Sequence, residues 1–112
     1  MAKRDPHNGR YILHGKIPVP CEDLMEWAEW FENADKERVV VQEYIGDYQV
    51  STVFLGLDHS WRDDEPPLLF ETMVFWKDGG VVDDAPVDRA PTWELALEMH
   101  AKAVLWVREQ LN

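Results

Sequence analysis

Two strongly apolar segments in the middle of the chain are separated by a short charged loop. The segments read TVFLGL at residues 52–57 and PPLLFETMVFW at residues 66–76. The loop between them contains Asp58, His59, Asp63, Asp64 and Glu65. Apolar runs of this kind are buried in a folded protein, whereas so many charged side chains stay in water. The core of the fold must therefore lie next to an acidic surface loop.

Strand patterns extend on both sides of this loop. Residues 11–17 predict a short strand that stops at Pro18, and residues 38–57 predict a hairpin around the turn Gly46-Asp47. In this hairpin Ile45 would oppose Tyr48, Val41 would oppose Thr52 and Val39 would oppose Phe54. Residues 68–76 predict a third long strand, entered through two prolines. Its alternation turns Phe70, Thr72 and Val74 inward and Glu71 outward, because a buried unpaired carboxylate is costly.

Helical periodicity predicts two helices, over residues 21–33 and 92–111. Thr92 suits the N-cap of the second helix. His100 lies in the middle of the broad apolar stripe of that helix. Leu95, Met99 and Trp106 form a second stripe about 120° away from it.

The order β-α-β-β-β-α predicts an α+β fold with a small antiparallel sheet and two helices packed on one face. Residues 11–112 form a single domain, and residues 1–10 are expected to be a flexible tail. The second sheet face would carry an apolar patch of Val40, Val53, Leu55, Leu69, Met73 and Phe75. Either this patch is a surface for a second copy or a partner, or the loop 77–91 folds over it.

The net charge of −11 excludes direct binding to nucleic acid or to an anionic membrane. Two interpretations of this charge remain open. It either keeps the protein soluble, or it mimics a polyanion and lets the protein occupy a basic groove on a nucleic-acid-handling protein. Cys21 is the single cysteine, so no intrachain disulfide forms and a reducing cytoplasm is expected. No apolar run approaches the ~20 residues that span a bilayer.

Acidic residues give the candidate binding surfaces. Glu22, Glu26 and Glu29 share one helix face at spacings of ~5–6 Å, near the spacing of strand phosphates, although a solvated helix face looks the same. The other candidates for partner binding are Asp63, Asp64, Glu65 and Trp106.

Histidines and carboxylates give the candidate polar sites. Asp58 and His59 have no second histidine at ligand spacing, so neither a metal nor a cofactor is expected. His100 is expected to pack and to hydrogen-bond a neighbour, or to form a polar network with His59 or Glu71.

The segments TVFLGLDHSW (52–61), PPLLFETMVF (66–75) and TWELALEMH (92–100) resemble a family of small, mostly uncharacterised acidic phage and prophage proteins. The segment DLMEWAEWFENAD (23–35) is also similar, and the resemblance covers roughly residues 11–111. The chain departs from the family at Met99, where glycine is frequent, and in the loop 77–91. The resemblance implies a virus-encoded protein in the host cytoplasm and supplies no activity.

The expected function is therefore binding, with no catalytic residue. A phage accessory protein would dock on a host protein and inhibit a bacterial defence system, such as a CRISPR effector or another nucleic-acid-handling complex. One alternative is a metal-dependent or other small enzyme that uses Asp58, His59 and His100. Another is a structural homodimer that pairs through the second sheet face.

Overall fold

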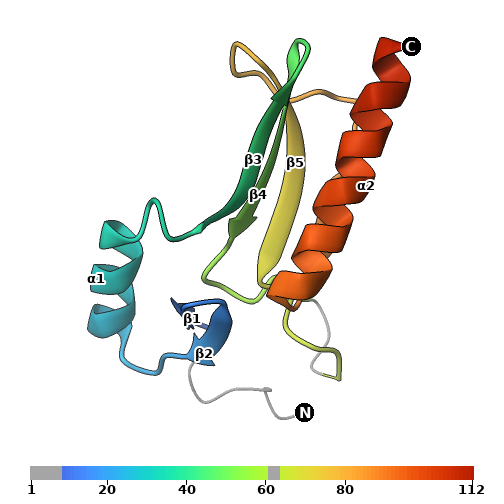
Figure 1. Ribbon diagram of the computed structural model, residues 1–112. Coiled ribbons are helices and arrows are strands. Elements are labelled where there is room, and N and C mark those ends of the chain that lie inside the picture. The colour runs from blue at the N-terminus through green and yellow to red at the C-terminus, as the bar shows by residue number, and fades with distance from the viewer. Residues whose placement is uncertain (1–8, 61–63) are drawn as a thin grey trace.

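The computed structural model describes residues 9–60 and 64–112. The elements follow the order β1 (Tyr11–His14), β2 (Ile17–Pro20), α1 (Leu24–Asn33), β3 (Val39–Ile45), β4 (Tyr48–Phe54), β5 (Phe70–Trp76), β6 (Asp88–Ala90) and α2 (Trp93–Leu111) (Figure 1). The strands β1 and β2 form one antiparallel sheet, and β3-β4-β5-β6 form the other. The α+β class is confirmed.

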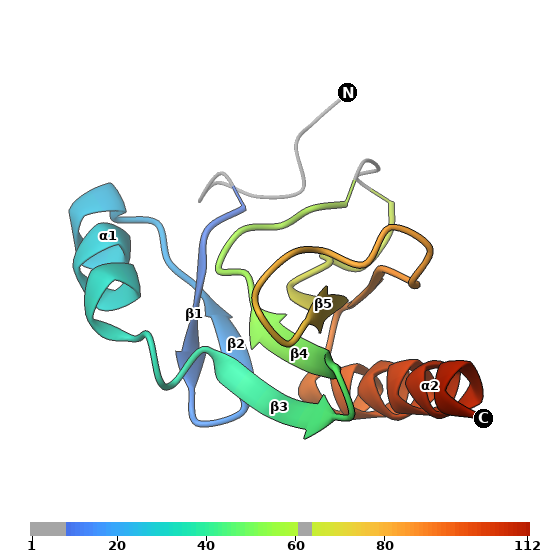
Figure 2. The ribbon, with the colours of Figure 1, turned by 90° about the horizontal axis from the view of Figure 1, so that it is seen from above.

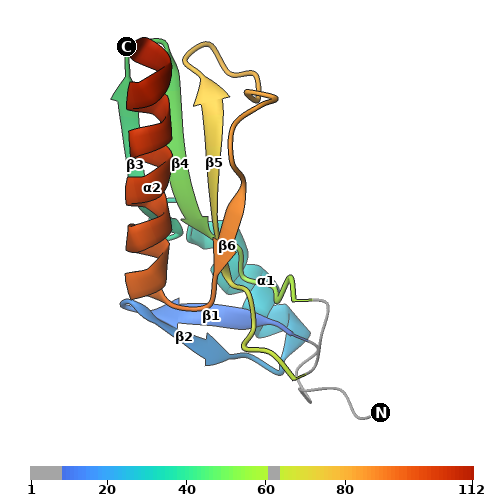
Figure 3. The same cartoon turned by 90° about the vertical axis from the view of Figure 1, so that its right-hand side faces the viewer.

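The core lies between α2 and one face of the four-stranded sheet. Figure 3 shows α2 in front of β3 and β4, with β5 and β6 to the side. The face toward α2 carries the fully buried Val50, Thr52 and Phe54 of β4 and Phe70, Thr72 and Val74 of β5. The small residues Ala96 and Ala103 of α2 pack against these side chains. Their size allows the helix to approach the sheet closely.

The β3–β4 hairpin contains the predicted turn at Gly46-Asp47, where Gly46 has a φ of 59°. Ile45 pairs with Tyr48 and Val41 with Thr52, as predicted. The prediction that Val39 opposes Phe54 is wrong, because Val39 pairs with Val53 across a register shift between Val39 and Val41. Such a bulge inserts an extra residue, which alternation alone does not reveal.

The loop 77–91 lies along the outer edge of β5. The N–H of Val82 donates to the Val74 carbonyl at 3.1 Å, and the Val82 side chain enters the core beside Ala103. The strand β6, which the sequence did not predict, then pairs with β5. Leu69 is fully buried and Val40 packs against the core, so the predicted second-face patch reduces to the half-buried Val53, Leu55, Met73 and Phe75.

The N-terminal part lies at one end of the sheet, where Tyr11 and Leu13 of β1 join the core (Figures 1 and 2). The expected single strand over 11–17 is wrong, because the chain turns at Gly15-Lys16 and returns as β2. Both Pro18 and Pro20 pair within β2, which proline tolerates because β2 is an edge strand. Residues 1–8 of the expected tail lie outside the described residues, and Gly9 already accepts a hydrogen bond from the Asp58 N–H.

The helix α1 packs against β1 and buries none of its residues completely. Trp27 anchors it, since the indole N–H donates to the carbonyls of Tyr11 at 3.1 Å and Gly56 at 3.0 Å. Leu24 and Met25 stay 56% and 74% exposed. The apolar face of α1 is therefore only partly used within this chain.

Candidate functional site

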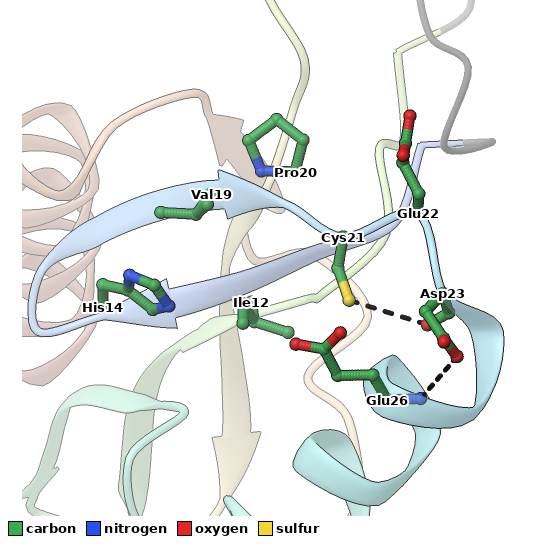
Figure 4. Close-up of a pocket in the computed structure, with 8 residues that line it drawn as sticks. All are labelled: Ile12, His14, Val19, Pro20, Cys21, Glu22, Asp23 and Glu26. Atoms are coloured by element: carbon green, nitrogen blue, oxygen red, sulfur yellow. Dashed lines mark hydrogen bonds between the residues drawn. The ribbon is translucent and has the colours of Figure 1, made fainter.

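A hollow of about 540 Å³ opens between the β1–β2 hairpin and the first turn of α1 (Figure 4). We call it the acidic hollow. It is lined by Ile12, His14, Val19, Pro20, Cys21, Glu22, Asp23 and Glu26. Ile12 and Cys21 are buried, while Glu22, Asp23 and Glu26 are exposed. The hollow therefore combines an apolar floor with an acidic rim.

Local sequence explains how these groups come together. Pro20 ends β2, and Asp23 then caps α1 by accepting the Glu26 N–H at 3.0 Å. The Cys21 thiol donates to the Asp23 carbonyl, and Arg10 donates to the Glu22 carbonyl at 2.7 Å. Figure 4 shows the Glu26 side chain reaching back toward Ile12 and Cys21.

The electrostatics of the acidic hollow favour a cation. The described lining residues include three carboxylates and neither lysine nor arginine. A lysine or arginine side chain can lay its methylene stem on apolar surface while its charge meets carboxylates. The hollow thus has the chemistry to receive one basic side chain.

Cys21 is not suited to nucleophilic chemistry here. Burial raises the pKa of the Cys21 thiol, and the nearby negative charge of Glu26 raises it further, against an opposing hydrogen bond at Asp23. Because the thiolate is the reactive form, a raised pKa keeps this group unreactive at neutral pH.

The predicted acidic face of α1 is exposed next to the hollow. Glu26 and Glu29 are exposed on one side of α1, and the exposed Met25 lies one turn from Glu29. Glu22 is exposed too, but it precedes the N-cap Asp23, so the prediction that it shares a helix face with Glu26 and Glu29 is wrong. Leu24 is exposed on the other side of the first turn. This mixed group of carboxylates and large apolar side chains is called the α1 surface below.

The second predicted acidic group lies on the loop after β4. Asp63 lies outside the described residues, and Asp64 and Glu65 are exposed. Asp58 organises the loop by accepting the N–H groups of Ser60 at 2.8 Å and Leu68 at 2.9 Å. The His59 ring bonds to the Leu57 carbonyl at 2.9 Å.

Two further predicted residues have structural contacts of their own. Trp106 packs edge-on against Tyr48 with ring centres 6.2 Å apart, at the turn end of the β3–β4 hairpin. Glu71 forms an ion pair with Arg89 of β6 at 3.0 Å.

A polar chain runs from the exposed Glu43 of β3 through the buried His100 of α2 into the sheet. Glu43 bonds the Nε2 of His100 at 2.7 Å, and the Nδ1 of His100 bonds the Thr52 hydroxyl at 2.7 Å. Thr52 in turn bonds Thr72. His100 thus forms a polar network as one alternative expected, but with Glu43 and Thr52 in place of His59 or Glu71. The signal in the sequence was that Thr52 and Thr72 are inward-facing polar residues in two apolar strands.

This chain has the hydroxyl–imidazole–carboxylate order of nucleophilic hydrolases. However, Thr52 is 0% exposed and His100 is 4% exposed, so a substrate cannot reach the hydroxyl. Both ring nitrogens of His100 are engaged within the network, so it does not form a joint centre with Asp58 and His59. The arrangement fixes how α2 sits on the sheet.

Within the described ranges, no group of three His, Cys, Asp or Glu side chains is placed to hold a metal ion. No helix among the described residues has the length and apolar character needed to cross a membrane. Comparison with protein-family models, with curated proteins and with solved structures found no match.

Proposed function

We propose that this protein binds a basic, partly apolar segment of another protein through the acidic hollow and the α1 surface. The observation that carries the proposal is the exposure of Met25 one turn from Glu29, with Leu24 also exposed in the first turn of α1 and Glu22 and Glu26 on the rim of the hollow. Large exposed apolar side chains within a polar rim are typical of interaction sites. A partner with alternating basic and apolar residues would satisfy both components.

The charge of the whole chain supports the same kind of partner. A net charge of −11 attracts basic surfaces over distances of about a Debye length, ~10 Å at 0.1 M salt. Such attraction raises the association rate, while the apolar contacts slow dissociation. The binding would therefore be fast and sensitive to salt.

The resemblance to phage proteins extends the proposal to a target in the host cytoplasm. Carboxylates spaced along α1 can occupy a groove that normally holds nucleic-acid phosphates. We propose inhibition of a bacterial defence complex, for example a CRISPR effector, by such mimicry.

The test is capture of partners from bacterial lysate on the immobilised protein. Replacing Glu22, Glu26 and Glu29 with Gln should abolish capture, and raising the salt concentration should weaken it steeply. The matched control replaces Asp78, Asp83 and Asp84 in the loop 77–91 with Asn, which removes the same charge elsewhere. Equal capture by both triple variants would contradict the proposal.

The apolar component is tested separately. The double variant Leu24→Ala and Met25→Ala removes exposed side chains that have little structural role, so folding should be unchanged. We expect the captured partner to dissociate at least about tenfold faster, as for loss of central apolar contacts.

A further inference from the structure

We propose that two copies of this chain pair through the outer edge of β3 and the adjacent side of α2. The two four-stranded sheets would then form one continuous antiparallel sheet, with both α2 helices side by side on one face. This inference does not rest on the proposed function, because it uses neither the acidic hollow nor the α1 surface.

The strand β3 is a long sheet edge, and its one register shift lies near the N-terminal end, between Val39 and Val41. It ends the strand order, so no described strand pairs with its outer side. Its sequence VVVQEYI contains no lysine, proline or glycine, and Glu43 is its one charged residue. Sheet edges are commonly protected by lysine or proline, because unpaired backbone groups recruit other strands.

The turn fixes which backbone groups of β3 face outward. Ile45 and Tyr48 flank the two-residue turn and form the first ladder pair. Backbone groups alternate direction along an antiparallel ladder, so those of Gln42 and Tyr44 point away from β4. A two-fold axis at Gln42 would pair it with Gln42 of the second copy and would place Glu43 opposite an uncharged residue, Val41.

The side of α2 that leans over β3 carries exposed apolar residues. Leu97 is 43% exposed and Leu105 is 61% exposed, and Val104 between them is half-buried. Helical geometry places these residues, with Ala101, on the side of α2 toward Glu43. We call these four residues the β3-side stripe.

One symmetry axis serves both the strand and the helix. His100 bonds Glu43 of β3 and also Thr52 of β4, which pairs with Val41 of β3. Gln42 lies between Val41 and Glu43, so it is at the same height along the sheet as His100 and Ala101 of α2. About Ala101, Leu97 of one antiparallel helix lies opposite Leu105 of the other. The small side chain of Ala101 sits at the crossing point, where two helices must approach closely.

The same axis also pairs opposite charges. Glu94 and Arg108 are equally distant from Ala101 along α2, and both are exposed. Glu94 of each copy would therefore meet Arg108 of the other. This complementarity offsets part of the repulsion between two chains of net charge −11.

The two helices would lie on the same face of the joined sheet. The helix α2 contacts all four strands, β3 included, and Figure 3 shows it in front of β3 and β4. Packed helices have interaxial distances of roughly 8–10 Å. The proposal therefore requires the exposed leucines of the two β3-side stripes to fill the space between the helices.

The test is the mass of the full chain in solution, measured by light scattering over a range of concentrations. We expect a species of twice the 13.1 kDa chain mass. Leu97→Glu should raise the dissociation constant roughly tenfold or more. Leu95→Glu is the matched control, because Leu95 is 44% exposed but lies on the opposite side of α2.

Charge exchange provides a second variant set that does not disturb the core. Glu94→Arg and Arg108→Glu should each weaken the dimer, and the double variant should restore it. A wild-type chain that stays monomeric up to roughly 1 mM would overturn the proposal. So would a dimer that Leu95→Glu disrupts and Leu97→Glu leaves intact.

Discussion

At the scale of single residues, His100 connects the two layers of the core. Its ring is 4% exposed and bonds Glu43 and Thr52. His100→Ala should lower the free energy of unfolding by about 2–4 kcal/mol, because it leaves a cavity and unpaired hydroxyls. Urea unfolding measures the loss. His14→Ala is the control, because His14 is exposed, and it should change stability by less than about 0.5 kcal/mol.

Cys21 allows a second prediction at this scale. Burial and the charge of Glu26 raise the pKa of its thiol, so alkylation by the neutral reagent iodoacetamide should be slow at pH 8. Glu26→Gln should lower this pKa, which moves the midpoint of the pH–rate profile down and speeds the reaction. Glu29→Gln removes the same charge farther along α1 and should have little effect. Equal acceleration by both variants would show that Glu26 has no specific influence.

The same raised pKa has a consequence for stability. The folded state holds the Cys21 proton more tightly than the unfolded chain does, so the contribution is fully present below the ordinary thiol pKa of about 8.5. It is lost as the pH rises through the folded-state pKa. Stability from this group therefore declines only in alkaline solution.

At the scale of elements, the attachment of α1 depends on Gly56. Its φ is +78°, and a Cβ atom there would lie 2.9 Å from the ring of Phe31. Gly15 also has a positive φ, at +65°, but a Cβ there would have no neighbour within 4 Å. Substitution of Gly15 therefore tests backbone strain alone, whereas substitution of Gly56 tests backbone strain together with the clash against Phe31.

We expect Gly15→Ala to cost about 1–2 kcal/mol from backbone strain alone. Gly56→Ala should cost a further 1–3 kcal/mol or so, because Phe31 must move and α1 with it. Denaturant unfolding measures both. Equal costs for the two variants would mean that α1 adjusts freely.

At the scale of the whole molecule, the excess of negative charge opposes folding. Moderate salt screens repulsion between exposed carboxylates, so the melting temperature should rise by a few degrees between about 10 mM and 200 mM salt. The Gln variant at Glu22, Glu26 and Glu29 should show a smaller rise, because it carries less of the repulsion. A salt response independent of these residues would place the repulsion elsewhere.

Local patterns determined much of this fold. The alternation in residues 48–54 and 70–76, the turn at Gly46-Asp47 and the N-cap at Thr92 each depend on neighbours in sequence, so the sequence predicted them. The outward position of Glu71 followed from the cost of burying a charge. The sequence did not predict that Arg89 is the ion-pair partner of Glu71, because the three-residue strand β6 is too short to show an alternating pattern.

Only the tertiary structure decided the contacts between distant elements. His100 lies 57 residues from Glu43 and 48 from Thr52 in the chain, and no local pattern joins them. The bulge at β3, the return of β2 and the burial of Val82 likewise depend on how elements meet in space. The sequence by itself established that this chain has an acidic surface and an apolar core. Which apolar residues remained exposed, at α1 and along α2, depended on the packing, because a helix face is buried only where another element covers it.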